Sequence, residues 1–302
     1  MYRSTVFGLV VSFATQAFAA SDTTPAQVDV SFAEDTGEVA RIESAEYLRT
    51  YTQEVASAAC FLYNDIDTGL SSELLRESRV GFEKRLNALI HGNEELGIIG
   101  GEQRRKTALK LTKIGEEWAP IADAIDALLA DPGNSQAVDV IKAKNMDLFE
   151  MTDIIVSDIE AQYANPAIIV QADVLLLEIV GRQAMMTQKI AKDACKVFTG
   201  DQSQEVKDLL QGSVQIYEAS LDALLNGMPS LGIQPAPTPE IAEQLTAIQS
   251  DWATVRPIVD TLVQGGSVDR ETQVYLFKHM VEEMVRLEEL SHAYVQHSKY
   301  IY

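Results

Sequence analysis

The feature that most constrains the fold is a set of segments repeated at a nearly fixed spacing. Residues 52–60 (TQEVASAAC) match residues 187–195 (TQKIAKDAC) at a shift of 135, and the same shift aligns residues 82–89 (FEKRLNAL) with 217–224 (YEASLDAL). A shift of 134 aligns Trp118 with Trp252 and residues 144–146 (KNM) with 278–280 (KHM). Matches held in register over this distance indicate an internal duplication. A period this long indicates two tandem domains, since solenoid repeats span roughly 20–50 residues.

Each half of the chain has the pattern of four amphipathic helices, with apolar residues recurring at three- and four-residue steps. Turn signals rich in Gly, Pro, Asp and Asn divide the first half into predicted helices over about 38–66, 71–93, 102–130 and 135–163. The second half is divided into predicted helices over about 167–198, 202–226, 239–264 and 268–299. No segment alternates as a β-strand does. We therefore predict an all-α fold of two tandem antiparallel four-helix bundles, residues 38–164 and 165–302.

The two predicted bundles meet at Asn165 and Pro166. Proline cannot donate the backbone hydrogen bond that an uninterrupted helix needs, so the chain turns or kinks there. A full turn would set the bundles side by side with their first helices parallel, whereas a kink would stack them end to end. The sequence leaves both arrangements open.

The N-terminus predicts export. Residues 1–19 have a charged start at Arg3, a short apolar stretch and a small-residue cleavage site at Ala17 to Ala19, as in a secretory signal peptide. Residues 20–37 are polar and predict a disordered leader. No later segment has the roughly 20 apolar residues of a transmembrane helix. We expect a periplasmic protein that does not span the membrane.

Net charge narrows the choice of partners. The formal charge of −21 becomes −22 once Arg3 is removed with the leader. A surface this acidic repels nucleic acid and anionic lipid, and we exclude both as partners.

The two cysteines, Cys60 and Cys195, occupy equivalent places in the two repeats. Neither has a partner in its own repeat. The first interpretation is two small buried thiols, and the alternative is a disulfide between the repeats.

The sequence lacks the motifs of the common enzyme and cofactor classes, and we predict no catalytic residue and no cofactor. His279 with Glu282, and Glu289 with His292, each place an imidazole and a carboxylate on one face of the last helix. A carboxylate-bridged di-iron bundle needs two Glu-x-x-His pairs, and only one such pair exists. We predict no metal site, and Trp118 and Trp252 are expected to anchor the cores of their bundles.

Polar residues interrupt the apolar stripe of the helix that opens the second repeat. Gln183 and Thr187 lie on this stripe with Arg182 beside them. Polar groups on a packing face need partners, which either a neighbouring helix or a bound ligand supplies. The sequence allows a satisfied inter-helix hydrogen-bond cluster as well as a small polar ligand at a helix seam.

Residues 181–192 (GRQAMMTQKIAK) resemble the Gly-Arg-Gln-Arg-Met-Leu-Ser-Gln-Arg motif of the type IV pilus methyl-accepting chemotaxis transducer N-terminal domain, the PilJ-type domain. The resemblance extends through residues 191–195 and, more weakly, to the first repeat. That domain is similar to the periplasmic sensor domain of NarX-type nitrate and nitrite sensor kinases. The resemblance implies a signal-transduction module that is linked to chemotaxis or type IV pili and is able to form a homodimer.

In the nitrate sensors, a first-helix arginine binds the anion at a dimer interface, and it corresponds to the second arginine of the motif. The second repeat has Ala184 at this position and the first repeat has Arg49, while the first motif arginine is Arg182 in the second repeat and Tyr47 in the first. If the first helices pair, both arginines would border one seam with Cys60 and Cys195 close together. A guanidinium fork suits a planar oxyanion. The predicted ligand-binding residues are Arg49, Gln53, Arg182, Gln183 and Thr187.

We therefore expect a non-enzymatic periplasmic sensor or binding module for a small oxyanion such as nitrate or nitrite. Because the sequence carries no membrane helix or kinase region, we expect it to act through a membrane-bound sensor or transporter. The alternative is a structural adaptor of the cell envelope that binds no small ligand, which would show a large exposed apolar patch. A metal carrier that uses the last helix is a third interpretation.

Overall fold

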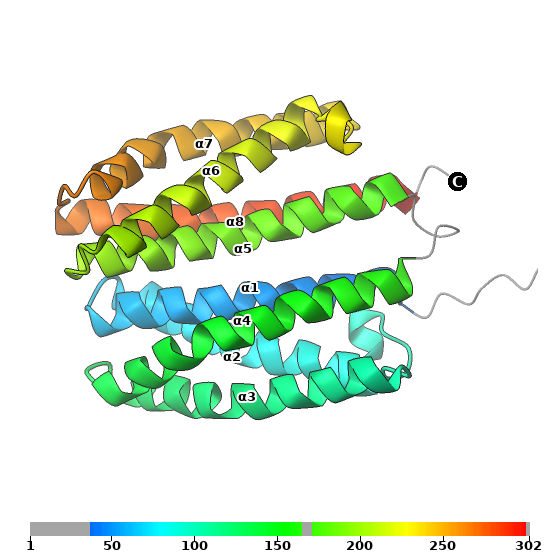
Figure 1. Ribbon diagram of the computed structural model, residues 1–302, viewed down its shortest axis with the longest axis horizontal. Coiled ribbons are helices and arrows are strands. Elements are labelled where there is room, and N and C mark those ends of the chain that lie inside the picture. The colour runs from blue at the N-terminus through cyan, green and yellow to red at the C-terminus, as the bar shows by residue number, and fades with distance from the viewer. Residues whose placement is uncertain (1–36, 165–170, 300–302) are drawn as a thin grey trace, which may run out of the picture. The chain divides into compact units, whose positions relative to one another are not determined.

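A computed structural model describes residues 37–164 and 171–299 of the 302-residue chain. Within these ranges the secondary structure consists of eight α-helices and two short 3-10 helices, with no β-strand (Figure 1). The all-α fold class predicted from the sequence is confirmed. The α-helices are α1 (Glu38–Tyr63), α2 (Thr68–His91), α3 (Arg105–Ala130), α4 (Ser135–Tyr163), α5 (Gln171–Phe198), α6 (Gln204–Asn226), α7 (Pro239–Val263) and α8 (Arg270–Lys299).

The helices pack in two groups of four. In the first group α1 packs on α2, α2 on α3, α3 on α4 and α4 on α1, and α5 to α8 follow the same cycle. Short connections make neighbouring helices antiparallel, as in an up-down-up-down bundle. Trp118 on α3 and Trp252 on α7 are both buried, which confirms the prediction that each lies in the core of its group.

The first helices of the two groups also pack on each other. Cys60 on α1 and Cys195 on α5 form a disulfide with a Cα–Cα distance of 6.2 Å. Near the other end of the seam, a Cβ added to Gly181 would lie 2.8 Å from Oε2 of Glu46. Both pairs differ by 135 in residue number, so α1 and α5 run parallel and in register. The two groups of helices therefore lie side by side, and the end-to-end alternative is excluded.

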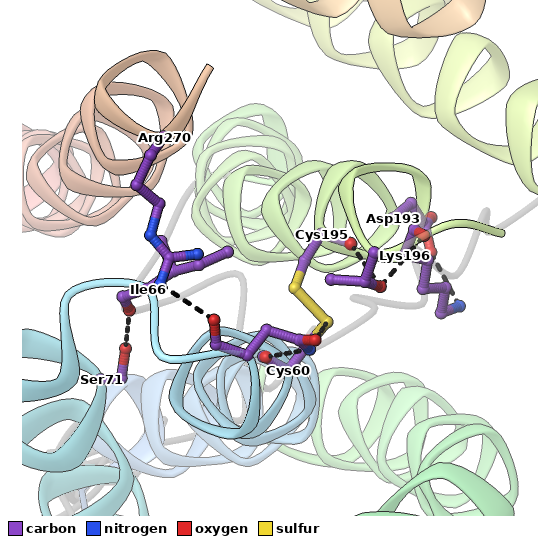
Figure 2. Close-up of a disulfide and its surroundings, with 9 residues drawn as sticks. Cys60, Ile66, Ser71, Asp193, Cys195, Lys196 and Arg270 are labelled. Atoms are coloured by element: carbon purple, nitrogen blue, oxygen red, sulfur yellow. Dashed lines mark hydrogen bonds and ion pairs between the residues drawn. A yellow bond between two sulfur atoms is a disulfide. The ribbon is translucent and has the colours of Figure 1, made fainter. Parts of the chain in front are cut away.

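Because Cys60 and Cys195 form a disulfide, our first interpretation of two separate buried thiols was wrong. Figure 2 shows the sulfur–sulfur bond joining Cys60 to Cys195, with Lys196 and Asp193 on the adjacent turn of α5. The bridge forms because the pairing of α1 with α5 brings equivalent positions within the range of about 4.4–6.8 Å that a disulfide requires between Cα atoms.

A shared apolar core also joins the two groups. The buried apolar residues of both belong to one contact cluster. At the end of the seam near the disulfide, the ring of Phe61 on α1 stacks on Phe277 of α8, with ring centroids 4.0 Å apart, and meets Phe198 of α5 edge-on at 6.3 Å. Aromatic pairs in these geometries add to the stabilisation from buried area. α1 therefore contributes to the cores of both groups.

Local contacts recur at the 135-residue offset. The isolated bridge between Asn93 and Ile98 after α2 corresponds to the bridge between Met228 and Ile233 after α6. Gly227 ends α6 at φ +79°, and an added Cβ there would lie 2.9 Å from the backbone nitrogen of Pro235. This position needs glycine because the left-handed backbone and the close approach both exclude a side chain. The sequence matches are thus accompanied by matching turn geometry.

The helix bounds follow the predicted ones except at a few ends. The first helix ends at Tyr63 instead of 66, because Asp65 and Asp67 adopt positive φ angles of 59° and 43°. Asp67 caps α2 by accepting a hydrogen bond from Leu70 N, so this helix begins at Thr68 and not at the predicted residue 71. The Ser71 hydroxyl donates back to the carbonyl of Ile66 at 2.8 Å.

Some predictions lie outside the described residues. These are the signal peptide, the leader up to residue 36 and the junction at Asn165 and Pro166. Across 37–164 and 171–299, every helix is too short or too polar to be a candidate membrane span.

Candidate functional site

The seam between α1 and α5 concentrates buried polar side chains. α1 packs against α2, α4 and α5 together, so almost all of its circumference is covered. Buried polar groups need hydrogen-bond partners, and a seam of this kind is where a ligand can supply them. The buried polar residues of these two helices include Arg41, Ser44, Glu46, Arg49, Thr50, Thr52, Gln53, Glu54 and Ser57 on α1, and Gln183, Thr187, Gln188, Lys192 and Asp193 on α5.

The structure brings Arg49 and Arg182 together on one carboxylate. Nη1 of Arg49 donates to Oδ1 of Asp153 on α4 at 2.9 Å, and Nη2 of Arg182 lies 3.6 Å from the same oxygen. Arg49 is fully buried and also donates to Glu46. Arg182 forms a second ion pair with Glu178 at 2.9 Å. Both guanidinium groups therefore already have carboxylate partners.

Two further carboxyl groups lie near Arg49, Arg182 and Asp153, and we call the whole set the arginine cluster. Burial raises the pKa of Glu46 to about 8, against the opposing effect of Arg49. Burial and the neighbouring Glu178 raise the pKa of Glu160 to about 7. Oε1 of Glu46 and Oε1 of Glu160 are both buried without a hydrogen-bond partner. An anion that binds Arg49 and Arg182 would therefore have to compete with the carboxylates around them.

The other three predicted ligand residues lie elsewhere. Nε2 of Gln183 donates to the carbonyl of Tyr217 at 2.8 Å, and the Thr187 hydroxyl donates to the carbonyl of Ala184 at 2.8 Å, so both are satisfied by neighbouring backbone. Oε1 of Gln53 accepts a hydrogen bond from Lys192 at 2.5 Å. Of the five residues predicted as one site, Arg49 and Arg182 share a partner, and the other three have partners of their own.

A narrow pocket lies between α1, α5 and α8. Its volume is about 40 Å³. Its walls are mainly apolar, with Ile42, Leu177 and Leu287 among them, and burial raises the pKa of its Glu288 to about 7. This volume is well below the roughly 300–1,000 Å³ that is typical of small-molecule sites.

A larger cleft, which we call the lysine cleft, lies between α1, α4 and α5. Its volume is about 430 Å³. It adjoins the disulfide, and Figure 2 shows Lys196 of its wall beside Cys195. Its lining residues are Ala56, Cys60, Tyr63, Asn64, Val138, Lys142, Asn145, Met146, Lys192, Lys196, Thr199 and Asp201.

Lys192 is the most unusual group in the lysine cleft. Its side chain comes from α5 and is buried, and Nζ reaches the neutral oxygens of Gln53 at 2.5 Å and Asn145 at 3.4 Å. Burial lowers the pKa of Lys192 to about 8, while the adjacent Asp193 opposes this shift. Lys192 makes no ion pair within the described ranges. A buried ammonium group with only neutral partners pays a large desolvation cost.

The predicted ligand-binding residues did not include these lysines, although the sequence contains a signal for them. Lys189, Lys192 and Lys196 follow one another at three- and four-residue steps in a chain with only 24 basic residues against 45 acidic ones. The equivalent of Lys192 in the first repeat is Ser57, 135 residues earlier, so the duplication itself marks Lys192 as a difference between the halves.

His279 and His292 of the last helix have separate partners. Nδ1 of His292 lies 3.5 Å from Glu43, and Nδ1 of His279 lies 3.1 Å from the carbonyl of Tyr275. Among the described residues, no group of three or more His, Cys, Asp or Glu side chains is arranged to hold a metal ion. The metal-carrier interpretation receives no support from this geometry.

Comparison with protein families identifies part of the chain. Residues 171–275 match the family model of the type IV pili methyl-accepting chemotaxis transducer N-terminal domain, PilJ. The match runs from the start of α5 into α8. The PilJ-type resemblance of this segment is thereby confirmed, whereas the assignment of the first repeat to the same family and the relation to nitrate sensors stay predictions. A comparison with curated proteins finds no match.

Proposed function

We propose that this chain is a sensory module of the periplasm, built of two PilJ-type bundles, that binds a small ligand at the seam between α1 and α5. It passes its state to a membrane-bound sensor or transporter. The observation that carries the proposal is that the helix opening the PilJ match, α5, pairs in register with its counterpart α1. The buried polar residues and the largest cleft described above both lie along this pair.

The pairing supports a sensory role for a physical reason. α1 and α5 each belong to a separate four-helix group, and their contact is the main connection between the groups. A ligand held between them favours one relative position of the groups over others by its difference in affinity. A partner that contacts both groups then reads the bound state. No chemical step is required of the seam, and the proposed role is binding without catalysis.

The finer part of the proposal is an oxyanion ligand such as nitrate or nitrite. The predicted anion-binding groups are the guanidinium groups of Arg49 and Arg182. Both lie close to Asp153, so the anion can enter only if it displaces this carboxylate. Asp153→Asn weakens that competition by removing the negative charge. We therefore expect nitrate to bind the wild-type chain weakly and the Asp153→Asn variant at least about tenfold more tightly, a difference of about 1.4 kcal/mol.

Isothermal titration calorimetry of residues 20–302 with sodium nitrate and sodium nitrite tests this ligand. Arg49→Met and Arg182→Met should each abolish the heat, and sodium chloride at equal ionic strength is the control. If neither anion binds the wild type or the Asp153→Asn variant at millimolar concentration, nitrate and nitrite are removed as ligands. A reporter enzyme that is active only after export, fused to residues 1–37, tests the periplasmic location.

An envelope adaptor that binds no small ligand is the second candidate function. Large apolar side chains that are exposed in the described residues are distributed over α2, α3, α4, α6 and α8, for example Val80, Leu109 and Ile216. No observation links them to a partner, and the sensory proposal is preferred because the seam combines buried polar groups with a cleft.

A further inference from the structure

We infer that the lysine cleft binds a small organic oxyanion, a carboxylate or a phosphate ester, whose charged group is held by Lys142, Lys192 and Lys196. The inference rests on the proposed sensory function for its role, and it names a ligand class and a site that differ from the arginine cluster.

Local charge is the first argument. In a chain of net charge −21, three lysines line one cleft. Lys196 is paired with Asp193 at 3.1 Å, and Asp193 is shared with Lys189 at 2.9 Å. Among the residues that the structure describes, Lys142 and Lys192 form no ion pair. Positive charge that is not neutralised locally attracts anions into a cleft whose surroundings repel them.

The environment of Lys192 is the second argument. An ammonium group has three donors. Those of Lys192 meet Gln53 at 2.5 Å, Asn145 at 3.4 Å and the thioether of Met146 at 4.0 Å, a weak acceptor. No carboxylate forms an ion pair with Lys192 among the described residues, and the nearby Asp193 offsets only part of the cost of burying the charge. An anionic ligand in the cleft would provide the missing opposite charge.

Size and lining set the ligand class. The cleft volume of about 430 Å³ falls in the range of about 300–1,000 Å³ that is typical of small-molecule sites. A cleft of this size has room for an anion that carries a carbon skeleton. Apolar groups from Ala56, Val138 and Met146 can contact a carbon skeleton, while Asn64 and Thr199 can contact hydroxyl groups. An anion with an organic body fits this combination.

Several charged groups surround Lys192 and set the pH dependence. Lys189, Asp193 and Lys196 come from α5, Lys142 comes from α4, and Asp201 lines the cleft from the loop after α5. From α1, the group in contact with Lys192 is the neutral Gln53. Because burial lowers the pKa of Lys192 to about 8, the empty site loses this charge between pH 7 and pH 9. Affinity for an anion should therefore fall by about tenfold over this interval.

Calorimetry on disulfide-bonded residues 20–302 with four probes tests the inference. The probes are citrate as the carboxylate, glucose 6-phosphate as the phosphate ester, inorganic phosphate as the anion without a carbon skeleton, and glucose as the uncharged control. At an ionic strength of about 50 mM, we expect citrate or glucose 6-phosphate to bind with a Kd of about 1 mM or tighter, and glucose not to bind. Comparison of the two organic anions assigns the head group.

Three variants locate the site. Lys192→Met should weaken binding of the better organic anion by at least about tenfold, and Lys142→Glu should weaken it by a similar factor. Lys142 is exposed, so its replacement leaves the fold intact and serves as the second variant. Lys84→Met is the matched control, because Lys84 is exposed and pairs with Glu95 away from the cleft. The tenfold loss between pH 7 and pH 9 should disappear in Lys192→Met.

Binding of neither organic anion, or equal binding by wild type and both cleft variants, overturns the inference. Such a failure leaves the nitrate titration at the arginine cluster as a separate test of the sensory proposal. Conversely, anion binding at the cleft with no effect on any membrane partner would sustain the inference and count against the sensory role.

Discussion

Lys192 on α5 donates a hydrogen bond to Oε1 of Gln53 on α1 over 2.5 Å, and this contact links the two four-helix groups inside the seam. The two residues are 139 positions apart in the sequence. Asn145 of α4 approaches the same ammonium group at 3.4 Å and donates to the carbonyl of Thr52 at 2.6 Å. Three helices therefore meet at one ammonium group that forms no ion pair among the described residues.

Replacing Lys192 by methionine should not destabilise the fold at pH 7. The lowered pKa of about 8 means that the folded state disfavours the charged form, at a cost of about 3 kcal/mol relative to the unfolded value. Methionine carries no charge, so the variant avoids this cost. It also cannot donate a hydrogen bond to Gln53, and that loss costs about 1–3 kcal/mol. We expect Lys192→Met to be equal to or up to about 2 kcal/mol more stable than wild type in urea unfolding.

The difference in stability between Lys192→Met and wild type should depend on pH. Below pH 8 Lys192 is charged in both states and the full cost is present, whereas above about pH 10.5 it is neutral in both and the cost disappears. The advantage of Lys192→Met should therefore shrink between pH 8 and pH 10.5. A loss of more than 2 kcal/mol at pH 7 in the variant, with Lys84→Met unchanged, would contradict this account.

The disulfide between Cys60 and Cys195 should contribute strongly to stability. It closes a segment of 135 residues, and the chain-entropy model assigns about 5 kcal/mol to a loop of this length. Reduction, or the double replacement of both cysteines by serine, should lower the free energy of unfolding by up to that amount. Urea titration with and without dithiothreitol measures it. The double variant should show no further response to dithiothreitol, and a response there would show that the reductant acts elsewhere.

Glu54 should make the protein more stable at acidic pH. It is buried on α1, its Oε1 accepts a hydrogen bond from Ser78 at 2.6 Å, and its Oε2 has no partner. Burial raises the pKa of Glu54 from 4.5 to about 8. Its contribution is therefore fully present below pH 4.5 and is lost as the pH rises to 8, at up to about 1.4 kcal/mol per pH unit.

The matching variant is Glu54→Gln, which stays neutral and keeps a carbonyl acceptor for Ser78. We expect the melting temperature of wild type to fall between pH 5 and pH 8 more steeply than that of Glu54→Gln, as followed by circular dichroism. Glu73→Gln on the exposed face of α2 is the control. Parallel curves for wild type and Glu54→Gln would show that this carboxyl is charged in the folded state.

Asp153 should contribute more to the free energy of unfolding than other surface aspartates do. It is the carboxylate shared by Arg49 and Arg182, and Arg49 is fully buried. Asp153→Asn leaves the Arg49 charge with Glu46 as its remaining partner, and we expect a loss of about 1–3 kcal/mol. Asp126→Asn is the matched control, because Asp126 pairs with the more accessible Arg79, and surface pairs are worth about 0–1 kcal/mol. If chemical denaturation shows the same loss of unfolding free energy for both variants, the arginine cluster contributes no more to stability than a surface ion pair does.

The sequence by itself determined the helical content and the boundaries of most helices. Helix formation and helix ends depend mainly on residues that are close in the sequence. Periodic apolar positions and turn residues therefore predict helices such as Pro239–Val263 and Ser135–Tyr163 without knowledge of the tertiary structure. The shift of 135 between the halves also carried the pairing of Cys60 with Cys195 as an alternative. The N-terminal end of α2 was misjudged, because Asp67 caps from a left-handed conformation that its neighbours do not signal.

Only the tertiary structure decided which polar groups meet. Arg49 and Arg182 do lie near each other, but Asp153 of α4 neutralises them, and a residue about 100 positions from Arg49 cannot be assigned to it by local spacing. Lys192 was overlooked because its burial depends on α1, α4 and α5 meeting at one level. Periodicity fixes the face of a helix on which a side chain lies. The charge of the site depends on the register between helices, which long-range packing sets.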